Sequence, residues 1–381
     1  MLSFKVLSCF LLFSLGSLSI KGDNNCDTKT EIVCYYGSWA IYRPDIGLFS
    51  TENIDPNLCT RIVYTFIGLD INLKLTSIDS YSDIDLGGFK NVTSLKEKNP
   101  CLKVVVAIGG WNEGSLKYSV MASTATSREE FANNALKFLA YYGFDGLDLD
   151  WEYPGSRGGI SDDKGNFALL LGAVREKFEP WGFQLSIAVS IDESIAAAAY
   201  DVSAINGLVD YVHLMAYDYT TGTSDVTGLI APLSAIKTSV NFWLDQGLSA
   251  SKLVLGIPTY ARYFVLEDEN NHDLGAPVEE KKYGGTYTGE DGFLAYYERK
   301  MLMASYPNCK TVTEDSNVYS YCEDEWMTYD TEETVAVKTQ YALDLKLGGV
   351  MVWSLDTDDF SGYYGTKYPL LTAIYHTING S

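Results

Sequence analysis

The chain has 381 residues and a formal net charge of -22 at pH 7, and 13% of its residues are aromatic. So acidic a chain repels polyphosphates, which excludes nucleic acid and anionic membranes as expected partners but does not exclude a neutral polymer. Its 28 tyrosines, 16 phenylalanines and seven tryptophans supply many flat rings that can stack on apolar faces.

The first segment has the pattern of a secretory leader. Val6–Leu15 is apolar, and Ser17 and Ser19 are small residues at the two positions that a signal peptidase reads. This run is too short for a membrane helix, and no later stretch approaches the required ~20 residues. We therefore expect a signal peptide at residues 1–19 and a secreted, extracellular protein from residue 20 to 381, with no membrane association. An even number of cysteines then remains, which favours disulfides over metal.

Eight short segments predict buried parallel strands, because they are rich in β-branched and aromatic residues without strict alternation. They are 32–39, 61–69, 103–111, 144–152, 184–191, 209–219, 252–260 and 348–355.

Helical patterns separate several of these strands. Ser127 and Glu130 predict a capping box for a helix that ends at Gly143, and 166–178 predicts another helix. Strand and helix repeated eight times predict an α/β fold, a closed (β/α)8 TIM barrel. After the seventh strand, about 262–327 predicts a small α+β insertion that walls one side of a groove at the top of the barrel.

The strongest candidate site lies in the fourth predicted strand. Side chains two apart share a face of a strand, so Asp148, Asp150 and Glu152 line the barrel interior, with Glu152 highest at the C-terminal mouth. A metal cage or a solvated acidic patch is the alternative, although one strand presents its carboxylates in a line whereas Mg²⁺ or Ca²⁺ wants converging oxygens. Carboxylates this close retain a proton, which makes Glu152 a candidate general acid.

A glycosidase uses such an acid to protonate the leaving oxygen. It ordinarily also needs a second carboxylate that faces the acid across the sugar. No other predicted strand end offers an obvious one, and Asp218 is the nearest candidate.

The spacing of Asp145, Asp148, Asp150 and Glu152 resembles the DxxDxDxE signature of glycoside hydrolase family 18, and the flanking FDGLDLDWEYPG resembles that of arthropod and vertebrate chitinases. The resemblance covers about residues 31 to 376, and its further motifs fall at predicted strand ends. They are Cys34-Tyr35 and Trp39 with Leu58-Cys59-Thr60, Ala107-Ile108-Gly109-Gly110-Trp111-Asn112 (an SxGG motif with Ala107 for Ser), Met215-Ala216-Tyr217-Asp218 (MxYD), Pro258-Thr259-Tyr260-Ala261-Arg262 (PxYGR) and Gly349–Trp353.

This resemblance implies a mechanism that needs no enzyme nucleophile, because the substrate's 2-acetamido carbonyl attacks the anomeric carbon. Glu152 is then the acid, and Asp150 accepts the acetamido N–H. Asp148 accommodates the charge, and Tyr217 donates to the acetamido oxygen. The residues implied to bind substrate are Tyr35, Trp39, Phe66, Gly109, Gly110, Trp111, Asn112, Tyr153, Met215, Ala216, Asp218, Tyr260, Arg262 and Trp353, the last as the floor of the groove.

Each of these residues also has a structural interpretation. A tryptophan such as Trp39 can simply pack the barrel rim, and the same holds for Phe66. Tyr217 and Asp218 can form a hydrogen-bonded pair, and Arg262 can neutralise the acidic interior.

The chain departs from the family after Asp218, where Tyr219–Thr223 and Gly228–Leu233 replace the usual tryptophan-bearing loop. This predicts weak stacking on the leaving-group side. Ala261 stands in place of a glycine, and Ile191 occupies a usually small position.

The resemblance implies a Cys34–Cys59 disulfide. The pairing of the other cysteines stays open, with Cys309 to Cys322 and Cys26 to Cys101 as one hypothesis. Asn91-Val92-Thr93 is an N-glycosylation acceptor.

We therefore expect an endo-acting chitinase that degrades chitin or chitooligosaccharides as a monomer, without metal or cofactor and without a separate chitin-binding domain. A non-catalytic chitin-binding lectin-like or signalling protein on the same scaffold is the competing hypothesis. An endoglycosidase that acts on N-glycans is a third.

Overall fold

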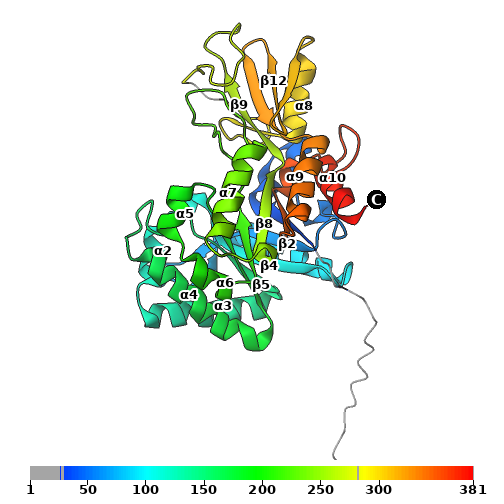
Figure 1. The fold of residues 1–381 in the computed structure, drawn as a ribbon. Coiled ribbons are helices and arrows are strands. Elements are labelled where there is room, and N and C mark those ends of the chain that lie inside the picture. Colours follow the sequence, from blue (N-terminus) through cyan, green and yellow to red (C-terminus); the bar gives the residue numbers. More distant parts are fainter. Residues whose placement is uncertain (1–25, 27–29, 281–282, 381) are drawn as a thin grey trace, which may run out of the picture.

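A computed structural model describes residue 26, residues 30–280 and residues 283–380, so the expected signal peptide lies outside the described residues. Figure 1 shows a barrel in the lower part of the molecule and a smaller sheet with β12 and α8 above it.

The barrel is a closed ring of eight parallel strands. Each strand pairs with its neighbours in the order β1-β14-β8-β7-β6-β5-β4-β2, and β1 also pairs with β2, which closes the ring. The predicted (β/α)8 fold is therefore confirmed. The strands are β1 (Glu31–Gly37), β2 (Arg61–Leu69), β4 (Lys103–Gly109), β5 (Gly146–Asp150), β6 (Gln184–Val189), β7 (Tyr211–Leu214), β8 (Leu253–Pro258) and β14 (Gly349–Trp353), with β3 (Leu75–Ser77) antiparallel on β2.

β2 has the predicted bounds, whereas the other barrel strands are shorter than the sequence predicted, as β4 illustrates at the barrel mouth. β4 ends at Gly109, whose φ of 117° suits only glycine. A Cβ at this position would lie 2.1 Å from the backbone oxygen of Asp150. The Gly110 N–H instead donates to that oxygen at 2.8 Å, so the two glycines tie the end of β4 to the strand that carries the carboxylates.

Helices cover the outside of the barrel, with α9 and α10 on its right in Figure 1 and α3 and α4 at its lower left. They are α1 (Gly88–Ser94), α2 (Leu116–Ala122), α3 (Ala125–Tyr142), α4 (Asp163–Phe178), α5 (Glu193–Ala199), α6 (Val202–Leu208), α7 (Leu233–Asp245), α9 (Glu332–Asp344) and α10 (Pro369–Asn379), whereas α8 (Tyr296–Ser305) belongs to the upper sheet.

The start of α3 corrects one prediction. The helix begins three residues before the predicted position, and its capping box joins Thr124 and Ser127 instead of Ser127 and Glu130. The Ser127 N–H donates to Thr124 Oγ1 at 3.1 Å. The predicted stop is confirmed, because Gly143 ends the helix with a φ of 78°.

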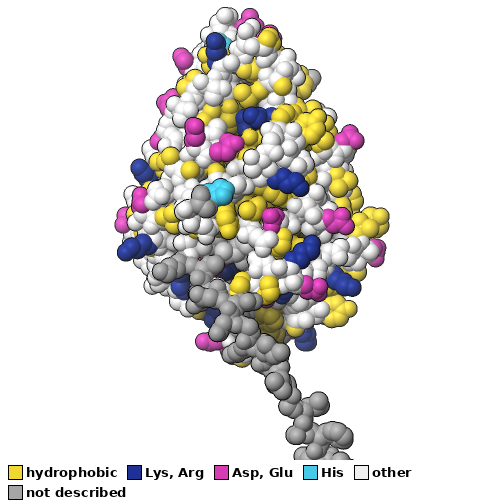
Figure 2. Space-filling model, turned by 90° about the vertical axis from the view of Figure 1, so that its right-hand side faces the viewer, with side chains coloured by type: hydrophobic (Ala, Val, Ile, Leu, Met, Phe, Trp, Pro, Cys, Tyr) yellow, Lys and Arg dark blue, Asp and Glu magenta, His cyan; other side chains and the backbone are white. Residues whose placement is uncertain are grey.

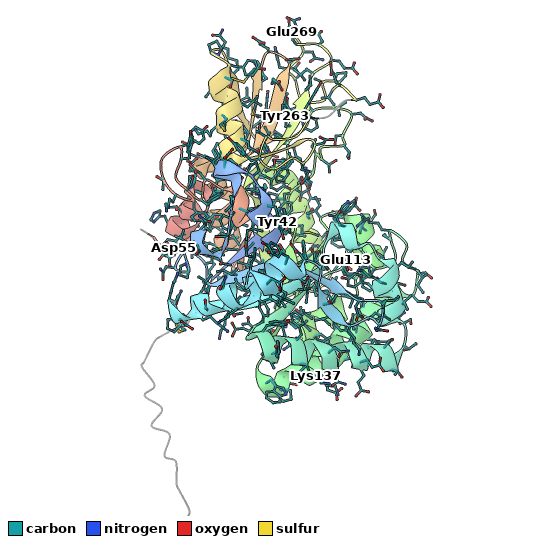
Figure 3. The ribbon with its side chains drawn as sticks, turned by 180° about the vertical axis from the view of Figure 1, so that it is seen from behind. Tyr42, Asp55, Glu113, Lys137, Tyr263 and Glu269 are labelled. Atoms are coloured by element: carbon teal, nitrogen blue, oxygen red, sulfur yellow. A yellow bond between two sulfur atoms is a disulfide. The ribbon has the colours of Figure 1, made fainter. Side chains whose placement is uncertain are left out.

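The second sheet is the expected insertion after the seventh barrel strand. Its strands are β9 (Tyr260–Val265), β10 (Phe293–Ala295), β11 (Lys310–Glu314), β12 (Asn317–Cys322) and β13 (Glu325–Tyr329), in the antiparallel order β10-β9-β13-β12-β11. Figure 3 places Tyr263 and Glu269 in this insertion and Lys137 at the far end of the barrel.

Buried polar contacts fix the insertion to the barrel. The Asp315 carboxylate accepts from the Ser234 N–H at 3.0 Å and so caps the start of α7. Asn317 accepts from the Ala231 N–H at 3.1 Å. Asp330 pairs with buried Lys338 of α9 at 2.5 Å. Two barrel segments, residues 231–234 at the start of α7 and α9, therefore hold one end of the insertion sheet in place.

Three disulfides connect the described cysteines. Cys34–Cys59 joins β1 to the segment before β2, as the resemblance implied, and the other bonds are Cys26–Cys101 and Cys309–Cys322. Among the described residues, no helix is long and apolar enough to cross a membrane. Figure 2 shows the face that carries the C-terminal helices, where apolar side chains are interspersed with acidic and basic ones.

Candidate active site

A cleft of about 1420 Å³ opens at the carboxyl ends of the barrel strands and is bounded on one side by the insertion. This volume exceeds the 300–1,000 Å³ of a typical small-ligand pocket, so the cleft is large enough for several linked rings. The predicted site residues that line it are Trp39, Phe66, Gly109, Gly110, Trp111, Asn112, Asp150, Glu152, Tyr153, Met215, Tyr217, Asp218, Tyr260, Arg262 and Trp353.

Three predicted residues do not line this cleft. Tyr35, Asp148 and Ala216 are each at most 1% exposed. The Tyr35 ring lies 5.5 Å from that of Trp353, and its hydroxyl donates to Asp148 Oδ2 at 2.8 Å. Tyr35 and Asp148 thus belong to a buried layer next to the cleft lining.

The carboxylate row has the alternation that a strand imposes. Asp148 and Asp150 face the barrel interior, and Glu152 follows just beyond the end of β5, where it lines the cleft. Trp151 points to the opposite side and packs against Tyr118 and Phe167, with ring centroids 5.9 and 5.7 Å away. Because the buried tryptophan anchors this side, the acidic side chains are held toward the interior.

The environment divides the three carboxyl groups into different protonation states. Burial raises the pKa of Glu152 to about 7, although a hydrogen bond from Tyr153 and the nearby Arg157 charge partly oppose it. Burial, then the charges of Glu152 and Asp148, raise the pKa of Asp150 well above its ordinary value. Near neutral pH, the outer part of the row therefore holds a proton.

Asp148 behaves in the opposite way. Burial disfavours its ionised form, but the neighbouring His213 and hydrogen bonds from His213, Ser186 and Tyr35 outweigh burial and lower its pKa. The Ser186 hydroxyl donates to Asp148 Oδ1 at 2.6 Å. The innermost carboxyl group is therefore the fixed anion of the row.

Two polar groups at the cleft have little to bind within the protein. Oδ1 of Asp150 is buried without a hydrogen-bond partner. The Tyr217 hydroxyl makes only a long contact, of 3.9 Å, with the thioether sulfur of Met351. Because an unpaired buried polar atom costs free energy, an acceptor and a donor in this position fit a ligand that supplies both partners, such as an amide.

Aromatic rings form a continuous apolar surface beside the carboxylates. The Trp39 and Phe66 rings stack at 6.1 Å with an interplanar angle of 10°, and both approach Trp353, at 6.2 and 5.9 Å. Trp39 is 41% exposed and Trp111 is 59% exposed, so both offer a free ring face. Such faces bind the apolar faces of sugar rings well.

Asp218 is already engaged by neighbouring side chains. Arg262 binds it through two nitrogens at 2.8 and 2.6 Å, and the Tyr260 hydroxyl donates to it at 2.9 Å. A carboxylate held by three strong donors is a poor nucleophile, so the second carboxylate that an ordinary retaining glycosidase needs is missing at this position. Arg262 consequently orients Asp218 and does more than balance charge.

Several residues of the site were not predicted from the sequence. Arg157 donates to the backbone oxygen of Glu152 at 3.0 Å and lies 3.5 Å above the Trp111 ring. Arg43 pairs with Asp356 at 2.8 Å on the cleft wall. Only Arg157 could have been predicted from the sequence, because it follows Glu152 by five residues. The Arg43–Asp356 pair joins residues far apart in the chain.

The altered segment after Asp218 is built onto the insertion. The Thr227 N–H donates to the Ala276 carbonyl at 2.9 Å, and the Ile230 N–H donates to Thr328 Oγ1 at 3.1 Å. Its tip, Thr221 to Thr223, lines the cleft. The wall at this point is therefore polar, without a tryptophan.

The described residues include no group of three His, Cys, Asp or Glu side chains that could hold a metal ion. The site that they form consists of a protonated acid, an unpaired acceptor, a free hydroxyl and an aromatic wall. Such a set suits proton transfer to a ring-containing neutral substrate.

Comparisons with known proteins agree with this geometry. The model of the family "Glycosyl hydrolases family 18" matches residues 31–358. "Probable chitinase 2" of Drosophila melanogaster is 40% identical over 355 residues, which cover 87% of this chain and 72% of that protein.

Two solved structures are also similar. The Ostrinia furnacalis Group IV chitinase in complex with allosamidin has a TM-score of 0.90 and 38% identity, over 92% of this chain and 99% of that one. Human YKL-39, described as a pseudo-chitinase with retained chitooligosaccharide binding, has a TM-score of 0.85 and 31% identity, over 92% and 100%.

Proposed function

The chain belongs to glycosyl hydrolase family 18, and we propose that it is a secreted, endo-acting chitinase that hydrolyses β-1,4 links between N-acetylglucosamine units. Support comes from the related chitinases of Drosophila and Ostrinia and from a cleft with room for several sugars. The observation that carries the proposal is the raised pKa of Glu152, about 7, beside an Asp150 oxygen without a protein partner.

The reaction begins with the substrate's own acetamido group. With the sugar seated over Trp353, the carbonyl oxygen of that group attacks the anomeric carbon while Glu152 protonates the departing glycosidic oxygen. Asp150 accepts the acetamido N–H, and Tyr217 donates to the acetamido oxygen. Water then opens the cyclic intermediate, activated by the Glu152 carboxylate, and the product keeps the β configuration.

The electrostatic order of the row supports these roles. Positive charge develops on the acetamido ring in the transition state, and the nearest carboxyl groups are Asp150 and, beneath it, Asp148. A preorganised anion near developing charge is a large source of rate enhancement. Asp148, whose pKa is lowered, supplies that anion throughout the reaction.

A non-catalytic chitin-binding protein is the second candidate, because human YKL-39 is described as a pseudo-chitinase that binds chitooligosaccharides. The acid, its neighbour and the inner carboxylate are all present in this chain, which favours catalysis. The cellular setting follows from the same proposal. Three disulfides fit export through an oxidising compartment, and the exposed Asn91 in α1 is the proposed glycosylation site of a monomeric, extracellular protein.

The test is hydrolysis of colloidal chitin by the wild-type protein and by Glu152→Gln. The wild type should release oligosaccharides of mixed length from the start, as an endo-acting enzyme does. Glu152→Gln should lose this release while it still binds the polymer. Activity above about one per cent in the variant, given the 10²–10⁴-fold share of general acid catalysis, contradicts the proposal.

A further inference from the structure

A buried network holds Asp148 from three other strands. Tyr35 of β1 donates to Oδ2 at 2.8 Å, and Ser186 of β6 donates to Oδ1 at 2.6 Å. His213 of β7 places Nδ1 2.7 Å from the Tyr35 hydroxyl and 3.3 Å from Asp148 Oδ1. None of these four residues is more than 1% exposed, so solvent does not compete for their contacts.

The hydrogen count of this network selects one form of the imidazole. Tyr35 has a single hydroxyl hydrogen, which it donates to Asp148, so its oxygen accepts from His213 and Nδ1 carries a hydrogen. Nε2 is buried without a hydrogen-bond partner. A hydrogen on Nε2 would be an unpaired buried donor, whereas a bare lone pair costs less.

Strand register explains why Asp148 depends on this histidine. In the barrel, Asp148 is flanked by Ala107 of β4 and Ser186 of β6. Ala107 has no donor to offer. The donors that remain are Ser186, Tyr35 and His213, and His213 is the one that contacts both Asp148 and Tyr35.

We infer that His213 is a positioning residue: its Nδ1–H, directly and through Tyr35, keeps Asp148 an ionised acceptor, so that the proton of the carboxylate row stays on Asp150 and Glu152. This inference rests on the proposed function, because it concerns how the acid of that reaction retains its proton. His213 does not line the cleft and acts only through Asp148 and Tyr35.

The groups around the network support this division. The titratable groups that face the network are Asp150 and Glu152, which lie beyond Asp148, and Tyr217, which follows β7. Burial, then Asp148, Asp150 and Tyr217, raise the pKa of Tyr35. Burial, then Glu152 and Asp148, raise the pKa of Asp150. From the neighbouring strands, β6 contributes Ser186 and β8 contributes Val254 as the register neighbour of His213, neither of them charged. The lowered pKa of Asp148 therefore depends on its donors His213, Ser186 and Tyr35, since no lysine or arginine is among the causes of that shift.

The test compares pH profiles of kcat/KM on chitotetraose for His213→Leu, which has no donor, and His213→Asn, which keeps one. Loss of a hydrogen bond to an ionised carboxylate raises its pKa, so Asp148 becomes protonated at higher pH. The acid limb of His213→Leu should move up by about one pH unit, and kcat at pH 5 should fall about tenfold with a smaller change in KM. His213→Asn should recover most of both effects.

A matched control is His376→Leu, at an exposed position on the outer helix α10, which should leave the profile unchanged. An acid limb of His213→Leu that coincides with the wild type overturns the inference. An equal shift of the acid limb in His213→Asn also overturns the inference, because the donor that this variant keeps would then have no effect on Asp148.

Nitrogen-detected NMR of the wild type gives a readout that needs neither activity nor a folded variant. The chain has three histidines, so the ring signals can be assigned one by one. The signal of His213 should show hydrogen on Nδ1, and hydrogen on Nε2 alone overturns the inference. If the wild type does not cleave chitooligosaccharides, the proposed function fails, and the NMR result still decides the arrangement of His213.

Discussion

Substitution of Glu152 by Gln removes the proton of the acid while it preserves the shape of the side chain. With a pKa of about 7, wild-type Glu152 carries its proton in about nine-tenths of the molecules at pH 6. A glutamine amide cannot give a proton to the leaving oxygen at any pH. The variant therefore isolates proton donation from binding.

The size of the loss depends on the leaving group. General acid catalysis contributes about 10²–10⁴-fold, which corresponds to about 2.7–5.4 kcal/mol of barrier. A sugar alkoxide needs that proton to depart, so Glu152→Gln should cleave chitotetraose more slowly than the wild type by this full factor. A nitrophenolate departs without help, so the loss in kcat/KM, which does not include the later water-activating role of Glu152, should be at least tenfold smaller on nitrophenyl chitobioside.

The assay follows reducing ends for chitotetraose and nitrophenol absorbance for the aryl substrate. Asp150→Asn is the matched control, because it removes the partner of the acetamido group and should slow both substrates to a similar extent. Equal losses for Glu152→Gln on the two substrates, or a loss below tenfold on chitotetraose, would refute the assignment of Glu152 as the acid.

Three further results are expected. The kcat/KM for chitotetraose should fall as pH rises through about 7, where Glu152 loses its proton. Arg157→Met should move this limb upward by about half a pH unit, because removal of a cation raises the pKa of Glu152. A downward shift of the limb in the pH profile of this variant contradicts this. Oligomers lengthened on the leaving-group side should gain little in kcat/KM, because the wall at Thr221 is polar, and a gain above about tenfold contradicts this. Lys338→Met should lower the free energy of unfolding by about 3–5 kcal/mol in urea, since buried Asp330 loses its partner, and a loss below about 1 kcal/mol contradicts this.

Most of the fold followed from local patterns in the sequence. Buried parallel strands read as apolar runs because helices cover them outside and other strands fill the barrel inside. The two-residue repeat fixed which side chains of β5 face the interior, so Asp148, Asp150 and Glu152 were identifiable. The family motifs then predicted most of the other residues that line the cleft.

Contacts between strands could not be read in the same way. The meeting of Asp148 with Ser186 and His213 depends on the register of β5, β6 and β7, which no single strand encodes. The cap of α3 was misplaced because Thr124 and Ser127 form a box as good as the one expected. Tyr35 was expected at the groove wall, but it lies within β1, where its hydroxyl contacts Asp148 and His213 and its side chain is buried.

The proposed mechanism depends most on a nucleophile that the substrate itself supplies. Proton NMR during the first minutes of chitotetraose hydrolysis reports the anomer of the new reducing end before mutarotation. We predict that the β anomer forms first and that a fully deacetylated tetramer stays intact. First appearance of the α anomer, or cleavage of the deacetylated tetramer at a comparable rate, would contradict the mechanism.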